Sequence, residues 1–317
     1  MGEPVVVKKH YFIDPGMKTL ARTRLPDTRT GIRLLNTKHR LLAPTPAASD
    51  EQVAYFHEEY SRADGSTGRI LRIKPRSLPY DAPALVYFAG GGFTFAPAPH
   101  HYRLARQYAL ECNCQVLLPD YRLLPDHSYP TPAQDAYAAW KWVNAHADGL
   151  LLDKHRIAIG GDGAGGCLAV SCMLQARDEG ADMPCFQLVL SPILNRLMTG
   201  NSFVYNADAP VWNKAWTERM WRAYQDISCI ADMKYASPAY EDNLKGLPPA
   251  YVELVINSAV YSDAAQYWGL LENSSIPAVL HEVQNAVHGF DAVADNPVTR
   301  DAVSRRIAAL KGAFSEK

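Results

Sequence analysis

The chain has 317 residues, of which 48% are hydrophobic and 21% are charged, and its formal net charge is −1. This length accommodates one large α/β domain with insertions, and the charge balance argues against a nucleic-acid partner. No stretch approaches the roughly 18 apolar residues of a membrane span, and the opening MGEPVVVKKHYF lacks the apolar core of a signal peptide. We therefore expect a soluble, cytoplasmic protein without a membrane partner.

The cysteines and histidines do not form a metal-binding or redox pattern. The 6 cysteines contain no C-x-x-C pair, and the 10 histidines contain no H-E-x-x-H spacing. In a chain of this size, spread cysteines are typical of buried thiols. We expect no disulfide framework, no metal site and no cofactor.

The predicted elements follow one another in a regular rhythm after residue 69. Residues 1–60 show weak periodicity, and the stretch EQVAYFHEEYSRA (51–63) is interpreted as a short helix. Apolar runs predict strands at 69–75, 82–90, 114–121, 155–161, 185–192, 248–256 and 277–283. Helical patterns lie at 100–112, 131–147, 164–180 and 261–271, and after Pro297.

This alternation predicts a mostly parallel, doubly wound sheet with helices on both faces. The rhythm breaks between about residues 195 and 240, where the sequence is aromatic and irregular. We expect residues 1–317 to form a single domain. Its cap comes from about 1–60 and 195–240, over the strand ends where open α/β sheets place their sites.

Four motifs appear in order: AGGGF at 89–93, DYRLLPDHSYPTPAQDAYAAWKWV at 120–143, GGDGAGG at 160–166 and VHGF at 287–290. With these motifs, the chain from about residue 80 onward resembles the hormone-sensitive-lipase group of α/β-hydrolase carboxylesterases. The resemblance implies an α/β-hydrolase fold. It also implies a serine nucleophile on a sharp strand-to-helix turn, a histidine base and an aspartate that orients the histidine.

Two of these three catalytic positions are changed. The resemblance assigns the nucleophile position to Gly163 and the base to His288, and counting back thirty residues assigns the aspartate position to Ser258. Glycine cannot attack an ester, and a serine hydroxyl supplies no negative charge. Cys167 is interpreted as a small buried residue rather than a replacement nucleophile, and Asp263 is expected to point away from the histidine.

The groups that would bind a ligand oxygen, rather than react with it, are expected to be retained in this chain. By resemblance, the oxyanion hole is formed by the backbone N–H groups of Gly90, Gly91 and Ala164, which do not depend on side chains. The leading histidine of the glycine motif is Ala89 here. The candidate aromatic lining of a ligand pocket is Phe93, Phe95, Trp212 and Trp216.

These features leave several functions open. The first is a non-hydrolytic protein that binds a carbonyl- or carboxylate-containing small molecule at the hole, as a receptor, carrier or scaffold. The second is a lyase, cyclase or isomerase that uses His288 as base. The third is a short-chain carboxylesterase inactivated at its nucleophile, and the fourth is a purely structural protein. A homodimer is compatible with each of them.

Overall fold

The computed structural model describes residues 11–224 and 233–315, so that Cys229 lies outside the described residues. The described strands form one sheet in the order β1-β2-β4-β3-β5-β6-β7-β8. Their bounds are Val53–Ser61 (β1), Thr67–Pro75 (β2), Ala82–Phe88 (β3), Gln115–Asp120 (β4), Leu152–Asp162 (β5), Gln187–Leu190 (β6), Ala250–Val255 (β7) and Ala278–Val283 (β8). Neighbours from β4 to β8 pair in parallel, whereas β2 pairs antiparallel with both β1 and β4. The predicted mostly parallel sheet is confirmed.

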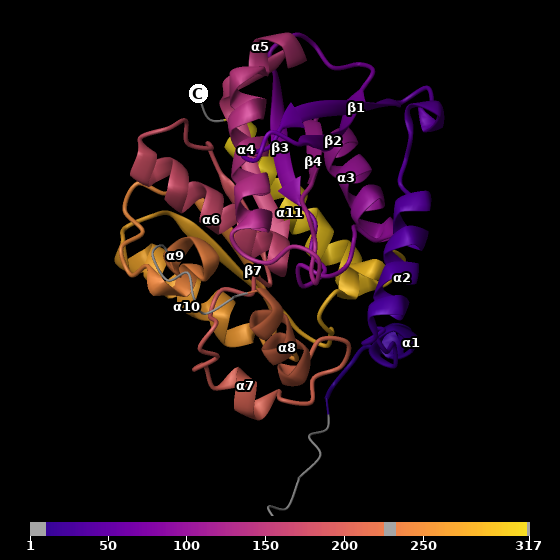
Figure 1. Ribbon diagram of the computed structural model, residues 1–317, viewed down its shortest axis with the longest axis vertical. Helices are drawn as coiled ribbons and strands as arrows, with labels where there is room; N and C mark the ends of the chain where they lie inside the picture. Colours follow the sequence, from indigo (N-terminus) through magenta and orange to yellow (C-terminus); the bar gives the residue numbers. More distant parts are fainter. Residues whose placement is uncertain (1–10, 225–232, 316–317) are drawn as a thin grey trace, which may run out of the picture.

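Helices cover both faces of this sheet (Figure 1). The longer ones are α2 (Arg29–Leu41), α3 (Pro99–Glu111), α4 (Thr131–Ala145), α6 (Ala164–Glu179), α8 (Lys214–Tyr224), α10 (Tyr261–Asn273) and α11 (Pro297–Ser315). The shorter ones are α1 (Lys18–Ala21), α5 (Ala147–Leu150), α7 (Ser202–Tyr205) and α9 (Met233–Ala236), with 3₁₀ turns at Pro15–Met17, Pro46–Ala48, Pro238–Tyr240 and Phe290–Ala292. No helix in the described part of the chain is long and apolar enough to span a membrane.

The helix expected at residues 51–63 is wrong, because these residues form the edge strand β1. The strand pairs with β2 over its whole length, from Val53 opposite Pro75 to Ser61 opposite Thr67. Val53 and Tyr55 are buried on one face, as the two-residue period of a strand requires. The β-branched and aromatic side chains of VAYF therefore decide the structure over the helix-favouring glutamates that follow.

The segments expected to form a cap contain helices that the irregular sequence did not predict. Helix α2, which the weak periodicity concealed, is fastened to the segment after the glycine motif. The Asn36 amide donates to the carbonyl of Thr94 at 2.9 Å and accepts the N–H of Ala96 at 2.8 Å. In the aromatic segment after residue 195, Trp212, Trp221 and the neighbouring aromatic rings pack into the main hydrophobic core.

Candidate functional site

The turn between β5 and α6 has the geometry of a nucleophile elbow. Strand β5 ends at Asp162, α6 begins at Ala164, and Gly163 between them has φ 51° and ψ −116°. Positive φ strains most residues and is accessible to glycine without a Cβ penalty. A Cβ built on Gly163 would lie 3.5 Å from His288 Nε2, its nearest neighbour. The nucleophile position and the base position are therefore in contact range.

Ser258 lies on the other side of the imidazole. Its Oγ is 3.3 Å from His288 Nδ1 and also accepts the N–H of Val260 at 3.3 Å. The Ser258 side chain is fully buried. The fold thus brings together all three positions that the motifs assign, but the group on Nδ1 is neutral and can either donate or accept. It cannot fix the imidazole tautomer as a carboxylate does.

The surroundings of His288 favour a neutral ring. Burial lowers the pKa of His288, and the carboxylates of Asp162 and Asp291 oppose that shift only in part. Removal from water penalises the imidazolium more than the imidazole. At neutral pH, the ring next to Gly163 is therefore uncharged and able to accept a proton.

Asp162 fastens the elbow to the glycine motif. Its Oδ1 accepts the Tyr87 hydroxyl at 2.8 Å and the N–H of Gly90 at 3.0 Å, and its Oδ2 lies 3.3 Å from His101 Nε2. Although burial raises the pKa of Asp162, the interactions with His101 hold it well below its usual range. A permanently charged carboxylate thus joins β3, α3 and β5 beside the site.

This bond corrects one member of the predicted oxyanion hole. The Gly90 N–H is engaged by Asp162, so it is not a free donor for a ligand oxygen. Within residues 11–224 and 233–315, no protein group accepts the N–H groups of Gly91, Gly92 and Ala164. Ala164 also opens helix α6, whose N-terminal end favours negative charge. Gly92, which sequence reasoning left out, therefore replaces Gly90 as a candidate donor beside Gly91 and Ala164.

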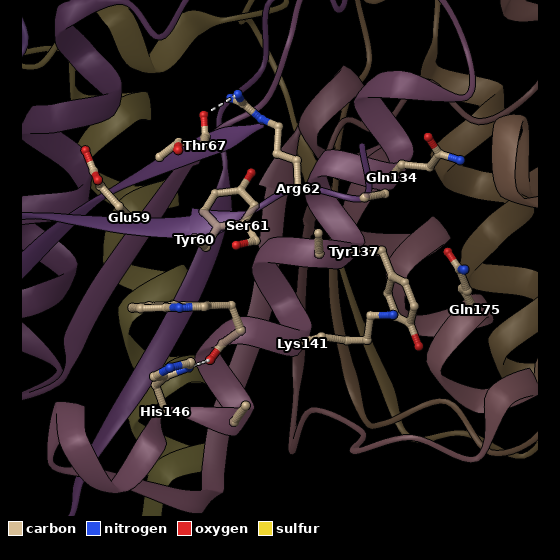
Figure 2. A pocket seen from close by; sticks show the side chains of 14 residues that line it. Glu59, Tyr60, Ser61, Arg62, Thr67, Gln134, Tyr137, Lys141, His146 and Gln175 are labelled. Carbon is tan, nitrogen blue, oxygen red and sulfur yellow. Dashed lines mark hydrogen bonds between the residues drawn. The ribbon is translucent and has the colours of Figure 1, made fainter. Parts of the chain in front are cut away.

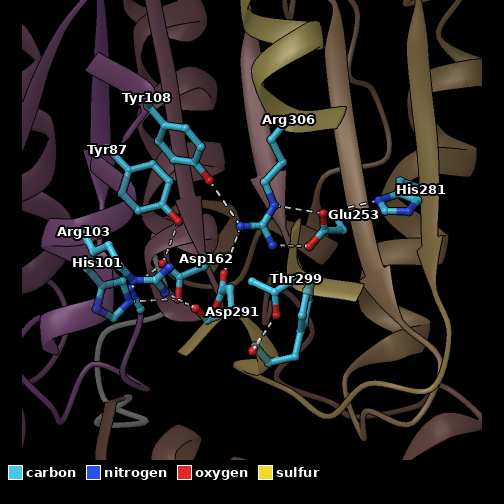
Figure 3. A network of polar contacts seen from close by, with 12 residues as sticks. Tyr87, His101, Arg103, Tyr108, Asp162, Glu253, His281, Asp291, Thr299 and Arg306 are labelled. Carbon is cyan, nitrogen blue, oxygen red and sulfur yellow. Dashed lines mark hydrogen bonds and ion pairs between the residues drawn. The ribbon is translucent and has the colours of Figure 1, made fainter. Parts of the chain in front are cut away.

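A buried ionic network supports the segment that carries the histidine (Figure 3). Arg306 of α11 binds both oxygens of Glu253 at 2.6 and 2.9 Å, and binds Asp291 Oδ2 and the Tyr108 hydroxyl at 2.9 and 3.2 Å. Arg306 and Glu253 are each 1% exposed. Asp291 follows His288 by three residues, so this network holds the loop that presents the imidazole. The one sequence signal for it is a glutamate inside the apolar strand AYVELV.

The four predicted aromatic residues do not share one open pocket. Phe93, Phe95 and Trp212 are buried, and the Trp212 ring centroid lies 6.2 Å from that of His288. A Cβ on Gly92 would meet Trp212 Cη2 at 2.1 Å, so glycine at this position lets the indole lie on the glycine motif. Trp212 therefore covers the site, and Trp216 alone of the four is half-buried and borders cavities of about 610 and 260 Å³.

A larger groove, of about 790 Å³, lies elsewhere on the molecule (Figure 2). It runs between the end of β1 and helix α4, with Arg62, Lys141 and His146 among its lining residues. None of the residues expected at the site lines it.

Cys167 and Asp263 behave as the sequence predicts. Burial raises the pKa of the Cys167 thiol, whose Sγ faces the carbonyl of Ala236 at 3.8 Å. Asp263 Oδ2 accepts the N–H groups of Leu194 and Asn195 at 2.8 and 3.0 Å, so its carboxyl group is directed away from the imidazole. Neither residue replaces a missing member of the triad.

Comparison with known proteins agrees with this architecture. The model of a family described as the alpha/beta hydrolase fold matches residues 85–292. The carboxylesterase NlhH of Mycobacterium tuberculosis is 32% identical over 322 residues, which cover 99% of each chain. The chain belongs to the hormone-sensitive-lipase-like family of α/β-hydrolases. Esterase LipI of the same organism is 34% identical over 73% of each chain. Bacterial heroin esterase has the same fold, with a TM-score of 0.86 and 27% identity over 96% of this chain and 99% of that one.

This α/β-hydrolase thus has a glycine at the turn between β5 and α6, with His288 beside it. Its elbow, its histidine and three unpaired backbone donors remain in place. Gly163 offers no side chain to form an acyl-enzyme, and the three N–H groups are candidate donors to a ligand oxygen.

Proposed function

We propose that this chain binds a small carbonyl- or carboxylate-containing ligand without turning over esters as a serine esterase does. The ligand oxygen lies against the N–H groups of Gly91, Gly92 and Ala164, at the positive end of α6. The observation that carries the proposal is the contact between Gly163 and His288. The elbow backbone lies beside the base, with a 3.5 Å separation from the Cβ position of residue 163 to Nε2, and no reacting side chain is present at that position.

Two further observations support binding over hydrolysis. The neutral hydroxyl of Ser258 leaves the imidazolium that forms during ester cleavage without its usual stabilisation. The unpaired N–H groups of the glycine motif and α6 need no catalytic partner to hold an anion. A site that binds a ligand without cleaving it is expected to lack the nucleophile and the charged partner of the base, and to keep its hydrogen-bond donors.

The neutral state of His288 favours a second candidate. Because burial lowers the pKa of the imidazole, Nε2 is a free base at neutral pH beside the elbow. A lyase, cyclase or isomerase needs a base and an oxygen-stabilising hole, and no nucleophile. In that case the bound carbonyl compound would lose a proton to His288 instead of leaving unchanged.

Ligand binding can be tested with butyrate, followed through tryptophan fluorescence, since Trp212 packs beside His288. We expect butyrate to bind the full chain and His288→Ala to weaken it several-fold. His127→Ala is the matched control, because His127 is exposed and lies outside the site. Equal binding by the full chain and His288→Ala, or no binding by either, would contradict the proposal.

A further inference from the structure

Two cavities meet at the side chains of Trp216 and Arg219, on the cap side of the molecule. The larger, of about 610 Å³, lies between residues 21–27 and 209–219. The smaller, of about 260 Å³, lies between α2, Leu124 and Pro125, and α8. In Figure 1, α1 and α8 lie at the same end of the molecule, which brings the two cap segments to one site.

The larger cavity is basic. Arg22, Arg24 and Arg219 line it, and Asp27 is the acidic residue among the described residues of its wall. Arg22 and Arg24 form no ion pair with any residue that the structure describes. Arg219 donates to the backbone carbonyl of Asp27, which leaves its charge unpaired. The cavity therefore carries excess positive charge and guanidinium donors, which suit a carboxylate.

The smaller cavity is mainly apolar. Its apolar lining consists of Ile32, Leu124, Pro125, Trp216, Met220 and Ala223. The charge of Arg29 at its edge is neutralised by Asp126, whose Oδ1 lies 2.5 Å from the guanidinium. An apolar group in this cavity loses contact with water and gains apolar contacts.

Trp216 and Arg219 lie at the boundary between the two cavities. The Arg219 guanidinium carbon lies 5.4 Å from the centre of the Trp216 ring, close enough for a cation–π contact. Both residues border both cavities, whose volumes together fall in the range of small-molecule sites, roughly 300–1,000 Å³. The site thus offers an apolar compartment and a basic compartment with a shared wall.

We propose that the cap holds a second ligand site, which takes a small amphipathic carboxylate. The apolar part of the ligand occupies the 260 Å³ cavity, and its carboxylate faces Arg22, Arg24 and Arg219. The Trp212 ring lies 5.9 Å from that of Trp216 and 6.2 Å from that of His288, and neither cavity is lined by Gly163, Ser258 or His288. The cap site is therefore independent of the function proposed for the oxyanion hole.

Calorimetric titration of the full chain with 4-phenylbutyrate and 4-phenylbutan-1-ol tests the proposal. The two probes share an apolar group and differ in charge. We expect the acid to bind about tenfold more tightly than the alcohol, and Arg22→Gln with Arg24→Gln to abolish that difference. Both arginines are exposed, so the double variant should fold normally. Trp216→Ala should weaken both probes.

Arg222→Gln is the control, because it removes one arginine charge at an α8 position that borders neither cavity. We expect it to leave both affinities unchanged. Equal affinities for acid and alcohol, an unaffected double arginine variant, or no binding of the acid would each overturn the cap site. A loss of acid binding in His288→Ala alone would overturn it as well, and would place the carboxylate at the oxyanion hole.

Discussion

The Oγ of Ser258 lies 3.3 Å from Nδ1 of His288, where an esterase of this family needs a carboxylate. The contact keeps the imidazole in position and removes the charge that would stabilise it when protonated. Because the Ser258 hydroxyl is neutral, burial is the largest influence on the pKa of the His288 ring. The site is therefore organised around a neutral histidine.

Introducing Ser258→Asp should raise the pKa of His288 from its lowered value. A carboxylate beside Nδ1 favours the imidazolium, so the ring would stay protonated to higher pH. The measurement is the titration of the His288 ring protons by NMR, assigned with His288→Ala. Ser258→Ala is the control and should not raise the pKa. A Ser258→Asp variant that titrates like the unmodified chain would show that residue 258 does not face the ring.

Restoring the nucleophile should return esterase activity in two steps. Gly163→Ser alone should hydrolyse p-nitrophenyl butyrate weakly, because the Cβ meets no atom closer than 3.5 Å but the base lacks its carboxylate. Gly163→Ser combined with Ser258→Asp should exceed the single variant by roughly 10³-fold or more. A double variant that is folded yet inert would mean that the pocket itself has diverged from ester substrates.

Replacing Arg306 with leucine should cost about 3–5 kcal/mol of unfolding free energy, because it leaves the carboxylates of Glu253 and Asp291 buried without their partner. Urea unfolding gives the value. Arg305→Leu is the matched control: its pair with Asp301 is 57% and 58% exposed, and the change should stay within about 0.5 kcal/mol. Similar losses in both variants would argue against the ionic network.

Asp263 should make stability fall as pH rises from about 4 to 7. Burial raises its pKa to about 7, whereas the unfolded chain releases the same proton near pH 4. Between these values the folded state binds more protons, so the unfolding free energy decreases with pH. Asp263→Asn keeps an oxygen for Leu194 and Asn195 and cannot titrate. Comparing urea unfolding at pH 5 and pH 8, we expect a smaller loss in the variant; an identical loss would exclude Asp263 as its source.

The sequence was sufficient for the parts of the fold that rest on local pattern. Continuous apolar runs such as APALVYF predict buried strands because parallel strands are covered on both faces. Strand β1 was misread because it contains helix-favouring glutamates, and its pairing with β2, which adds to the strand preference of its β-branched and aromatic residues, is not visible in a local pattern. Helix α2 was missed for another reason: most of its residues are polar and only Ile32 and Asn36 are buried, so few apolar residues mark its inner face.

The candidate site also contains residues that local motifs predict and contacts that only the folded chain defines. Motif spacing located Gly163, Ser258 and His288, and the fold brings them together. The bond from Gly90 to Asp162 joins residues 72 positions apart, and the pair of Glu253 and Arg306 joins residues 53 apart. No local pattern encodes such contacts. The covering position of Trp212 likewise depends on the close approach to Gly92, which only the folded backbone defines.

The most direct test of the central claim is hydrolysis of p-nitrophenyl butyrate by the unmodified chain and by His288→Ala at equal concentration. The account predicts that the two proteins give the same rate, because Gly163 provides no nucleophile for the base to activate. Turnover by the unmodified chain that disappears in His288→Ala would contradict the account, since it would show that the site still performs ester chemistry.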